Sequence, residues 1–283
     1  MSAKMEASVG GIPHDHIMAY GIVGSLVGIY LTYLNVLSGT EIFSFFGGLA
    51  AVAALVWGAN TIKHLCSYGL GTGVPSAGMI ALGSGAIGMV FASRYGMLAP
   101  IVAIIVAGIL GAIVGFVSNK IVNMNIPVME RSLTELAIVG AMSMMGFTAM
   151  LGGTFIFDGM VTGTSTFLGF VFADYGMSVI GGSTLAVTFM LAAIALQHPF
   201  NACLGPDEHQ DRTLMLGAEC GFLSMIPIAL MSFAFISFTS AVIALIVSVA
   251  GWCWTYVQFI ELSKRDAYAW LDAKPIQEPK GGE

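Results

Sequence analysis

Long runs of apolar residues, separated by short polar segments, follow one another along most of the chain. Each run has about 20 residues with few or no charges, the length that an α-helix needs to cross the ~30 Å hydrocarbon layer of a membrane. The pattern predicts eight spans with ends uncertain by several residues. They are Ile17–Leu37, Ile42–Ala59, Ser76–Ser93, Met97–Ser118, Leu136–Phe157, Gly176–Leu196, Leu214–Ile236 and Thr239–Ile260.

The composition agrees with a membrane protein. Apolar residues make up 57% of the 283 residues and charged residues only 9%, whereas soluble domains carry about 25% charged residues. Strands of a membrane β-barrel would alternate polar and apolar positions, and the runs here are continuous. We therefore expect an all-α, polytopic transmembrane helical bundle of about eight spans in the cell membrane. No basic stripe offers a surface for nucleic acid.

The positive charges divide unevenly between the two sides of the predicted bundle. Nine of the ten basic residues fall on the side of the termini and the even-numbered connections, and only Arg94 falls on the other. Lys and Arg favour the cytoplasmic side, so both termini are predicted to be cytoplasmic. The nine are Lys4, Lys63, Lys120, Arg131, Arg212, Lys264, Arg265, Lys274 and Lys280.

Three parts follow along the sequence: a cytoplasmic N-terminal segment (1–16), a transmembrane domain (17–260) and a cytoplasmic C-terminal tail (261–283). No clear cleavage site precedes the first span, so we interpret that span as an uncleaved anchor. The segment between Asp158 and Asp174 is apolar but too short to cross. It is either an extracytoplasmic loop, which we favour, or a re-entrant piece.

Two local motifs concern helix ends and helix packing. Ser132 and Glu135 have the spacing of a capping box directly before the fifth predicted span. Gly24 and Gly28 in the first span, and Gly111 with its partner four residues later in the fourth, are spaced one turn apart, which allows close helix contact. Packing within the chain and packing between subunits both remain open for these glycines.

Glu219 is the most informative ionisable residue, because it interrupts an otherwise uncharged stretch. Ionisable groups inside a membrane are costly and usually face a cavity or an ion path, and carboxylate oxygen suits a hard cation such as sodium. We therefore name Glu219 as an ion-path candidate, with Asp158 and Asp174 as weaker ones near the opposite mouth. A carboxylate that reaches the interface, or bonds within the bundle, is the alternative.

Other polar clusters do not match a known chemistry. The spacings of His64 with Cys66, and of His198 with Cys203 and His209, fit no zinc pattern, so we predict no metal site. The glycine-rich loop Gly69–Gly73 lacks the lysine and the strand context of a phosphate-binding loop. It is better explained as a tight turn against a neighbouring helix or subunit. No catalytic arrangement can be argued from spacing, and no cofactor is predicted on this chain.

Two loop strings carry a family resemblance. CSYGLGTGVPS at Cys66–Ser76 and QHPFNACLGP at Gln197–Pro206, together with GIVGSLVGIY from Gly21 and KIVNMNIPVMERSLTE from Lys120, resemble the C subunit of the membrane-bound tetrahydromethanopterin S-methyltransferase complex of methanogenic archaea. The resemblance covers most of the chain. It implies an archaeal cell-membrane protein.

The resemblance also implies a reaction and a set of partners. The complex would transfer a methyl group from methyl-tetrahydromethanopterin, or a related pterin, to coenzyme M through a corrinoid, and would couple this step to sodium export. The A subunit would carry the corrinoid, the H subunit would perform the pterin-side transfer, and the D and E subunits would share the membrane sector. This chain would then be a partner in translocation and assembly and not the methyl-transfer catalyst.

Under this interpretation the two polar strings are docking loops on the cytoplasmic side. Prolines limit the freedom of Gln197–Pro206, and its Gln197, His198 and Asn201 offer hydrogen-bonding groups near the interface. In the other loop the candidates are Gly69, Gly71 and Gly73.

Two rival hypotheses remain. A free-standing ion-coupled secondary transporter could also be built from eight spans, although no convincing internal repeat is visible. A purely structural component of the membrane sector would need no ion-handling residue.

Overall fold

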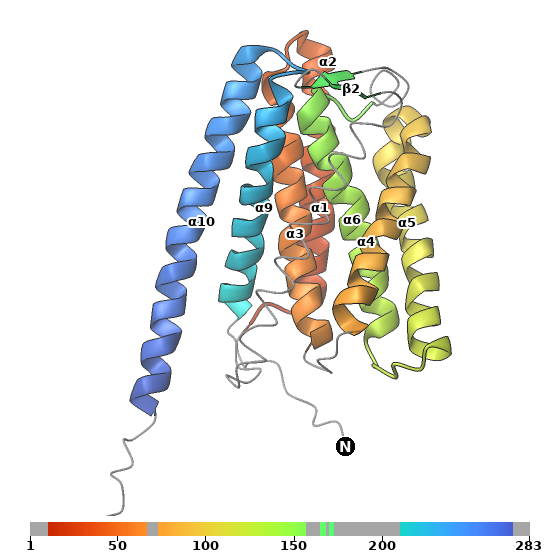
Figure 1. Ribbon diagram of the computed structural model, residues 1–283, viewed down its shortest axis with the longest axis vertical. Coiled ribbons are helices and arrows are strands. Elements are labelled where there is room, and N and C mark those ends of the chain that lie inside the picture. The colour runs from red at the N-terminus through yellow and green to blue at the C-terminus, as the bar shows by residue number, and fades with distance from the viewer. Residues whose placement is uncertain (1–10, 67–72, 157–164, 168–169, 173–209, 274–283) are drawn as a thin grey trace, which may run out of the picture.

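The computed structural model describes residues 11–66, 73–156, 165–167, 170–172 and 210–273. This part of the chain is almost entirely helical (Figure 1), which confirms the predicted all-α membrane bundle. The helices are α1 (His14–Leu31), α2 (Leu34–Ser38), η1 (Ile42–Ser44), α3 (Phe45–Cys66), α4 (Gly73–Ala92), η2 (Ser93–Leu98), α5 (Ala99–Phe116), η3 (Val117–Ile121), α6 (Met129–Gly152), α9 (Gln210–Ser232) and α10 (Phe238–Ala273).

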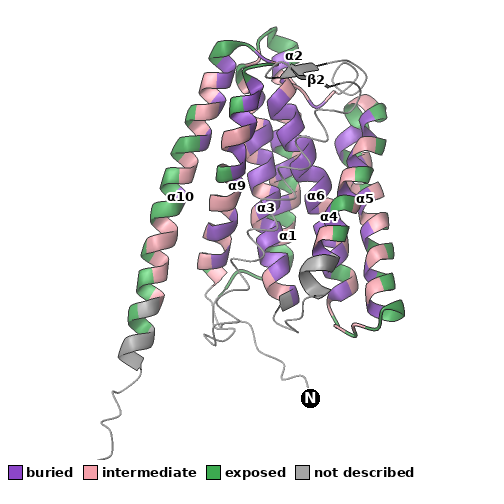
Figure 2. Cartoon of the chain, viewed as in Figure 1, coloured by how far each residue is buried: buried purple, intermediate pink, exposed green. Residues whose placement is uncertain are grey.

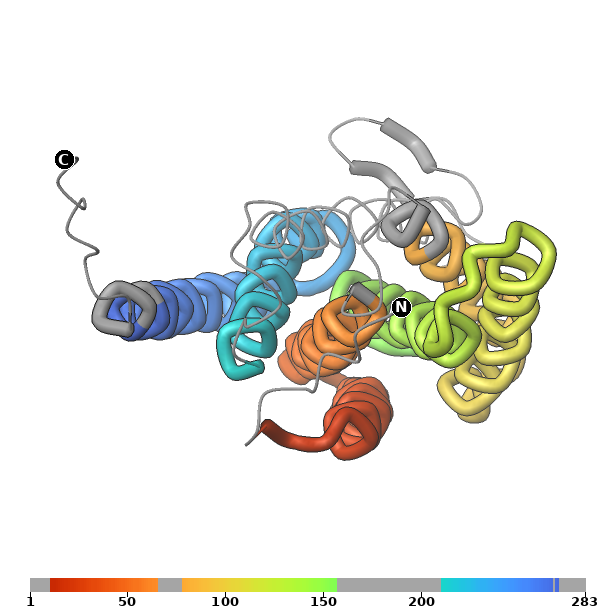
Figure 3. Tube along the Cα trace, turned by 90° about the horizontal axis from the view of Figure 1, so that it is seen from below, coloured from red at the N-terminus to blue at the C-terminus, as the bar shows by residue number. Residues whose placement is uncertain are grey.

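Helices α3 and α6 form the centre of the bundle. Helix α1 packs on α3, the α4–α5 hairpin packs on α6, and α9 packs on the other flank of α3 and carries α10 on its outer side (Figure 3). Burial follows this order, since α6 is buried over nearly its whole length while α5 and α10 expose apolar side chains along much of theirs (Figure 2). Exposed apolar faces are what a lipid-embedded helix presents.

Small residues bring the helix backbones close together. A β-carbon at Gly28 would lie 2.8 Å from Cβ of Ala50 on α3, and one at Gly111 would lie 2.6 Å from Cβ of Ala137 on α6. Both glycine pairs noted in the sequence therefore pack helices within this chain, which decides between the two alternatives left open. Without a hydrophobic drive in lipid, such close contact is a main source of helix association.

Seven of the eight predicted spans correspond to described helices. Among the described residues, six stretches are long and apolar enough to cross a membrane, and the longest of them, Gly78–Ile121, has 44 residues. At ~1.5 Å per residue this stretch would measure about 66 Å, too long for one crossing, and it reverses direction at Gly96, which has φ 50°. It thus supplies two spans, α4 and α5. The predicted span Gly176–Leu196 lies outside the described residues.

The described pieces of the Asp158–Asp174 segment are two short strands. Strand β1 (Ser165–Phe167) pairs antiparallel with β2 (Phe170–Phe172). Figure 1 draws them at the end of the bundle away from the N-terminus. A hairpin at this end agrees with the favoured extracytoplasmic loop.

The two ends of the bundle differ in charge. Helices α3, α5 and α10 end, and α1, α6 and α9 begin, at the end where Lys63, Lys120, Arg131, Arg212 and Arg265 lie; we call it the basic end. Arg94 lies at the opposite end, on η2. The alternation of helix directions thus reproduces the charge split on which the predicted orientation depends.

Helix α10 extends well beyond its predicted span. It has 36 residues, or about 54 Å of helix, against ~30 Å of hydrocarbon. The first part of the predicted C-terminal tail is therefore a continuation of the last helix, up to Ala273. Arg265 on this extension pairs with Asp211 at the start of α9, with a nitrogen-to-oxygen distance of 2.9 Å, so the extension stays tied to its neighbour.

Candidate functional site

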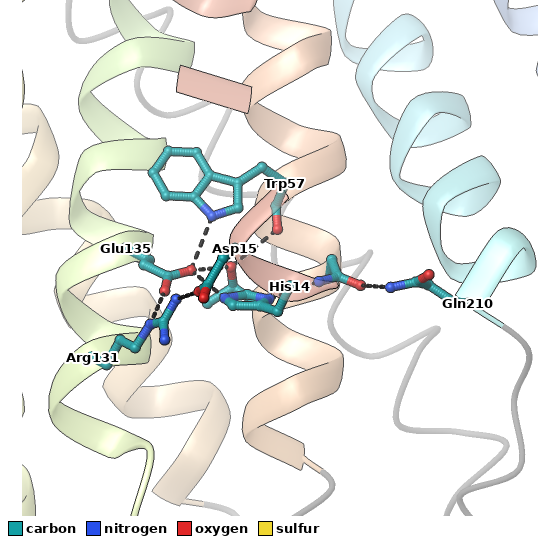
Figure 4. A network of polar contacts seen from close by, with 8 residues as sticks. His14, Asp15, Trp57, Arg131, Glu135 and Gln210 are labelled. Atoms are coloured by element: carbon teal, nitrogen blue, oxygen red, sulfur yellow. Dashed lines mark hydrogen bonds and ion pairs between the residues drawn. The ribbon is translucent and has the colours of Figure 1, made fainter. Parts of the chain in front are cut away.

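A single buried carboxylate at the basic end collects donors from three helices. Oε2 of Glu135 on α6 accepts hydrogen bonds from Trp57 Nε1 at 2.9 Å and Thr61 Oγ1 at 2.9 Å, both on α3, and lies 2.8 Å from His14 Nε2 on α1. Its Oε1 accepts from Arg131 Nε at 2.8 Å, one turn earlier on α6. Only 4% of the Glu135 side chain is exposed, so these contacts replace water almost completely (Figure 4).

Arg131 connects the buried Glu135 carboxylate to the protein surface. Its side chain is half exposed, and its Nη2 also donates to Asp15 at the start of α1. One guanidinium thus bridges a buried and an exposed carboxylate on two different helices. Such forked contacts are typical of arginine, whose planar group presents several donors at once.

A second line of contacts joins the cluster to α9. Nδ1 of His14 lies 2.8 Å from Nδ2 of Asn60 on α3, and Oδ1 of Asn60 accepts a 3.3 Å bond from Nε2 of Gln210. Gln210, the first residue of α9, also pairs with the backbone of Ile12: it accepts from Ile12 N at 2.7 Å and donates to Ile12 O at 2.8 Å. The side-chain amide thus holds the segment before α1 as a neighbouring strand would.

Aromatic contacts complete the cluster. The ring of His64, near the end of α3, stacks on His14 with centroids 4.9 Å apart. The absence of a side chain at Gly21 makes room for the indole, because a β-carbon there would lie 2.5 Å from Cβ of Trp57. We call the set His14, Asp15, Trp57, Asn60, Thr61, Arg131, Glu135 and Gln210 the Glu135 cluster.

The cluster overturns the predicted capping box. Helix α6 begins at Met129, with no side-chain cap at Val128, so Ser132 lies inside the helix and is buried. The carboxylate of Glu135 accepts from Arg131 on its own helix and contacts side chains of α1 and α3, in place of the N-terminal backbone. The local motif gave no information on the partners on α1 and α3, which come from distant parts of the sequence.

A cavity of about 340 Å³ adjoins the cluster between α1, α5 and α6. Met18, Ile22 and Ile138 give it apolar walls, and Arg131 and Glu135 lie at one side of it. The polar face of the cluster is therefore not completely covered by the described part of the chain.

The donor set of Glu135 favours a structural role over a catalytic one. Four donors occupy both carboxylate oxygens, and charge-assisted bonds of this kind are the strong ones. Within the described ranges, no three His, Cys, Asp or Glu side chains are placed to hold a metal ion. The Glu135 cluster is best described as a tether that joins α1, α3, α6 and α9 at the basic end.

The family is shown by comparison with known sequences. The family model that describes the C subunit of tetrahydromethanopterin S-methyltransferase matches residues 1–276. This chain belongs to that family. The C subunit of Methanosarcina barkeri is 40% identical over 261 residues, which cover 92% of this chain and 91% of that protein. That of Methanocaldococcus jannaschii is 39% identical over 272 residues, 93% of each chain.

A third relative supports the same assignment. The C subunit of Methanothermobacter thermautotrophicus is 40% identical over 231 residues, 78% of this chain and 79% of that protein. As a member of the C-subunit family, the chain is one component of a multi-subunit methyltransferase, which confirms the resemblance inferred from the two loop strings.

Glu219, the main ion-path candidate of this C-subunit chain, is half-buried on α9. It shares one face of the helix with Leu223 and Leu230, which are 46% and 53% exposed. Among the described residues, none forms a hydrogen bond or an ion pair with its carboxylate. Glu219 lies about 14 Å along α9 from Gln210, by the helical rise, and is therefore not part of the Glu135 cluster.

Most other predicted site residues lie outside the described residues. This applies to the ion-path candidates Asp158 and Asp174. It applies equally to the docking-loop candidates Gly69, Gly71, Gln197, His198 and Asn201. Gly73 is the first residue of α4. The predictions for these residues stay untested.

Proposed function

We propose that this C-subunit chain is a membrane component of a sodium-translocating methyltransferase that transfers a methyl group from methyl-tetrahydromethanopterin, or a related pterin, to coenzyme M. A corrinoid on the A subunit carries the methyl group, the H subunit acts on the pterin, and the D and E subunits complete the membrane sector. The proposal places the protein in an archaeal cell membrane with the basic end in the cytoplasm. The observation that most strongly supports this proposal is the family match over residues 1–276.

The structure supports a role in connecting the two sides of the membrane. The Glu135 cluster orders the helix ends at the basic end, where water-soluble partners would bind. Coupling requires that a partner reaction changes the relative stability of two states of the membrane sector. Helix ends that are held together by the Glu135 cluster would transmit such a change better than loosely packed loops, because packed elements shift between discrete arrangements.

Glu219 is the proposed ion-handling residue of this chain. A half-buried carboxylate without a described partner is costly in a membrane unless an ion, water or a partner protein reaches it. A sodium ion passing the outer face of α9 would supply that partner. Neutral glutamine has nearly the same shape and removes only the charge.

The test is sodium transport by the intact complex. The complex is purified through a tag on this chain, reconstituted into vesicles, and assayed for methyl transfer to coenzyme M and for sodium uptake. We expect Glu219→Gln to reduce sodium uptake and sodium-stimulated methyl transfer several-fold. The matched control is Glu261→Gln, which changes an exposed carboxylate at the basic end of α10 that pairs only with Lys264, at 3.3 Å, within the described residues.

Two results would contradict the proposal. If the tagged chain copurifies without a corrinoid protein, it is a free-standing transporter and not a component of this complex. If Glu219→Gln behaves like Glu261→Gln in both assays, this chain does not handle the ion through Glu219. That result would support the alternative that the chain is a purely structural component of the membrane sector.

A further inference from the structure

A second cavity lies at the opposite end of the bundle from the termini. It has a volume of about 790 Å³ and lies where α2, η1, the end of α6 and the start of α10 meet. Most of its lining residues carry polar side chains, and Glu41 is the only charged residue among the described residues that line it. The polar lining residues include Asn35, Thr40, Glu41, Thr154, Ser237 and Ser240.

The described residues use the Glu41 carboxylate only in part. Its Oε2 accepts a 2.6 Å hydrogen bond from the backbone N–H of Ser237, directly before α10. Its side chain lies against the end of α6, since a β-carbon at Gly153 would be 3.4 Å from Cγ of Glu41. In the part of the chain that the structure describes, no donor reaches Oε1. Among the described residues, one carboxylate oxygen is thus left available at the cavity.

The end of α6 adds negative potential to the same cavity. The last carbonyl groups of a helix have no partner within it, and together they act as about half a negative charge. Helix α6 ends at Gly152, and Gly153 follows in the left-handed conformation at φ 79°. Both residues line the cavity. The N-terminus of α10 adds positive potential to the cavity. Part of this positive potential is already offset, because the N–H of Ser237 is bonded to Oε2 of Glu41.

The cavity walls are fixed by a buried amide. Asn35 is 5% exposed; its Nδ2 donates to the carbonyl of Gly153 at 2.6 Å, and its Oδ1 accepts from the backbone N–H of Phe43 at 2.8 Å. These two bonds hold α2, η1 and the end of α6 in one arrangement. The oxygens around the cavity are therefore preorganised and need little rearrangement to receive a ligand.

The donor set identifies the ligand class. Carboxylate, hydroxyl and carbonyl oxygens are the ligands of small hard cations, and a single carboxylate favours a monovalent ion over a divalent one. We propose that this cavity is a sodium site on the extracytoplasmic side, with Oε1 of Glu41 as its charged ligand. The choice of sodium rests on the proposed function; the oxygen ligands themselves rest on the structure alone.

Protection of an engineered thiol tests the site. Thr239 is exposed and lines the cavity, so Thr239→Cys is introduced into a complex in which the four native cysteines of this chain are replaced. The purified complex in nanodiscs is treated with a membrane-impermeant thiol reagent in sodium, potassium or choline chloride at equal ionic strength. We expect sodium to slow labelling several-fold and in a saturable way, and potassium and choline to have no such effect.

Two further variants make the result specific. Glu41→Gln, which can still accept the bond from Ser237, should abolish the protection without loosening α10. Arg94→Cys, on the same face but away from the cavity, should label at one rate in all three salts. Equal labelling of Thr239→Cys in sodium and choline, equal protection by potassium, or protection that survives Glu41→Gln would each overturn the sodium site.

Failure of this inference differs visibly from failure of the proposed function. If vesicles with the unmodified complex take up no sodium during methyl transfer, the proposed function fails, whatever the labelling shows. If they take up sodium and sodium does not change the labelling rate of Thr239→Cys, only the proposed site at Glu41 is refuted.

Discussion

Replacing Glu135 tests whether the Glu135 cluster holds the basic end together. In Glu135→Ala the fully buried indole N–H of Trp57 loses its acceptor, and an unsatisfied buried donor costs about 1–3 kcal/mol. Thr61 keeps a 3.1 Å bond to the carbonyl of Trp57. The half-exposed Arg131 keeps its ion pair with Asp15 and is solvated by water, so the loss of its bond to Glu135 contributes little to the change in stability.

His14, whose side chain is only 14% exposed, also loses Glu135 as its partner. Together with the unsatisfied indole, this gives an expected loss of about 3 kcal/mol in unfolding free energy, the low end of the ~3–5 kcal/mol for removing one partner of a buried ion pair. Glu135→Gln should cost less, about 1–2 kcal/mol, because its amide oxygen can still accept one of the bonds. The matched control is Glu130→Gln on the same helix. Its carboxylate is 45% exposed and lies 3.8 Å from Lys120, so a cost below about 1 kcal/mol is expected.

The assay is unfolding of the full chain by SDS in mixed micelles, followed by circular dichroism of the helices. A double-mutant cycle with Trp57→Phe isolates the main term, since phenylalanine removes the donor that Glu135→Ala leaves unsatisfied. We expect Trp57→Phe to be milder in the Glu135→Ala background than in the wild type, with a coupling of about 1–2 kcal/mol. Strict additivity, or equal costs for Glu135→Gln and Glu130→Gln, would refute the energetic reasoning.

Three further predictions concern packing, the N-terminal segment and a docking loop. Gly47→Ala should destabilise the chain by about 1–3 kcal/mol, because its β-carbon would overlap a backbone carbonyl of α6, whereas Gly83→Ala, in open space, should be neutral or stabilising in the same SDS assay. Gln210→Ala should raise the hydrogen-exchange rate of the Ile12 amide, whose acceptor is the Gln210 side chain; unchanged exchange would show that another group holds it. His198→Ala should reduce complex assembly or methyl transfer, and unchanged values of both would exclude the loop from docking.

The spans were predictable because lipid leaves the backbone few choices. Without water to bond to, each apolar run has to close its own hydrogen bonds, so length and apolarity alone identify α1, α3, α4, α5, α6, α9 and α10. The glycine spacings likewise showed where backbones can approach. Neither signal tells which helices are neighbours, and the contact of α1 with α3, or of α5 with α6, came from the structure.

The Glu135 cluster was not predictable as a unit, because its members lie far apart in the sequence; His14 and Glu135, for example, are separated by 121 residues. One signal was available: polar side chains gather where spans begin or end, as with Asn60 and Thr61 near the end of α3. Polar groups at such depth need partners, and Arg131 with Glu135 one turn apart on α6 offered them. The capping-box prediction failed because it considered only neighbours in sequence.

Helix α9 links the features that bear on coupling. The string Gln197–Pro206, which is a predicted docking loop, shortly precedes it in sequence. Gln210 ties the start of α9 to the N-terminal segment, and Glu219 lies in its first half. At its far end α9 leads into α10, whose start is bound to Glu41. Its contact with α3 includes small residues, with Gly221 facing Val52 and Gly217 facing Ala59, while Gln210 bonds to Asn60 where α9 begins. A partner that moves the predicted docking loop would act on the cavity at Glu41 through the α9–α10 hairpin, which is the connection that the proposed sodium coupling requires.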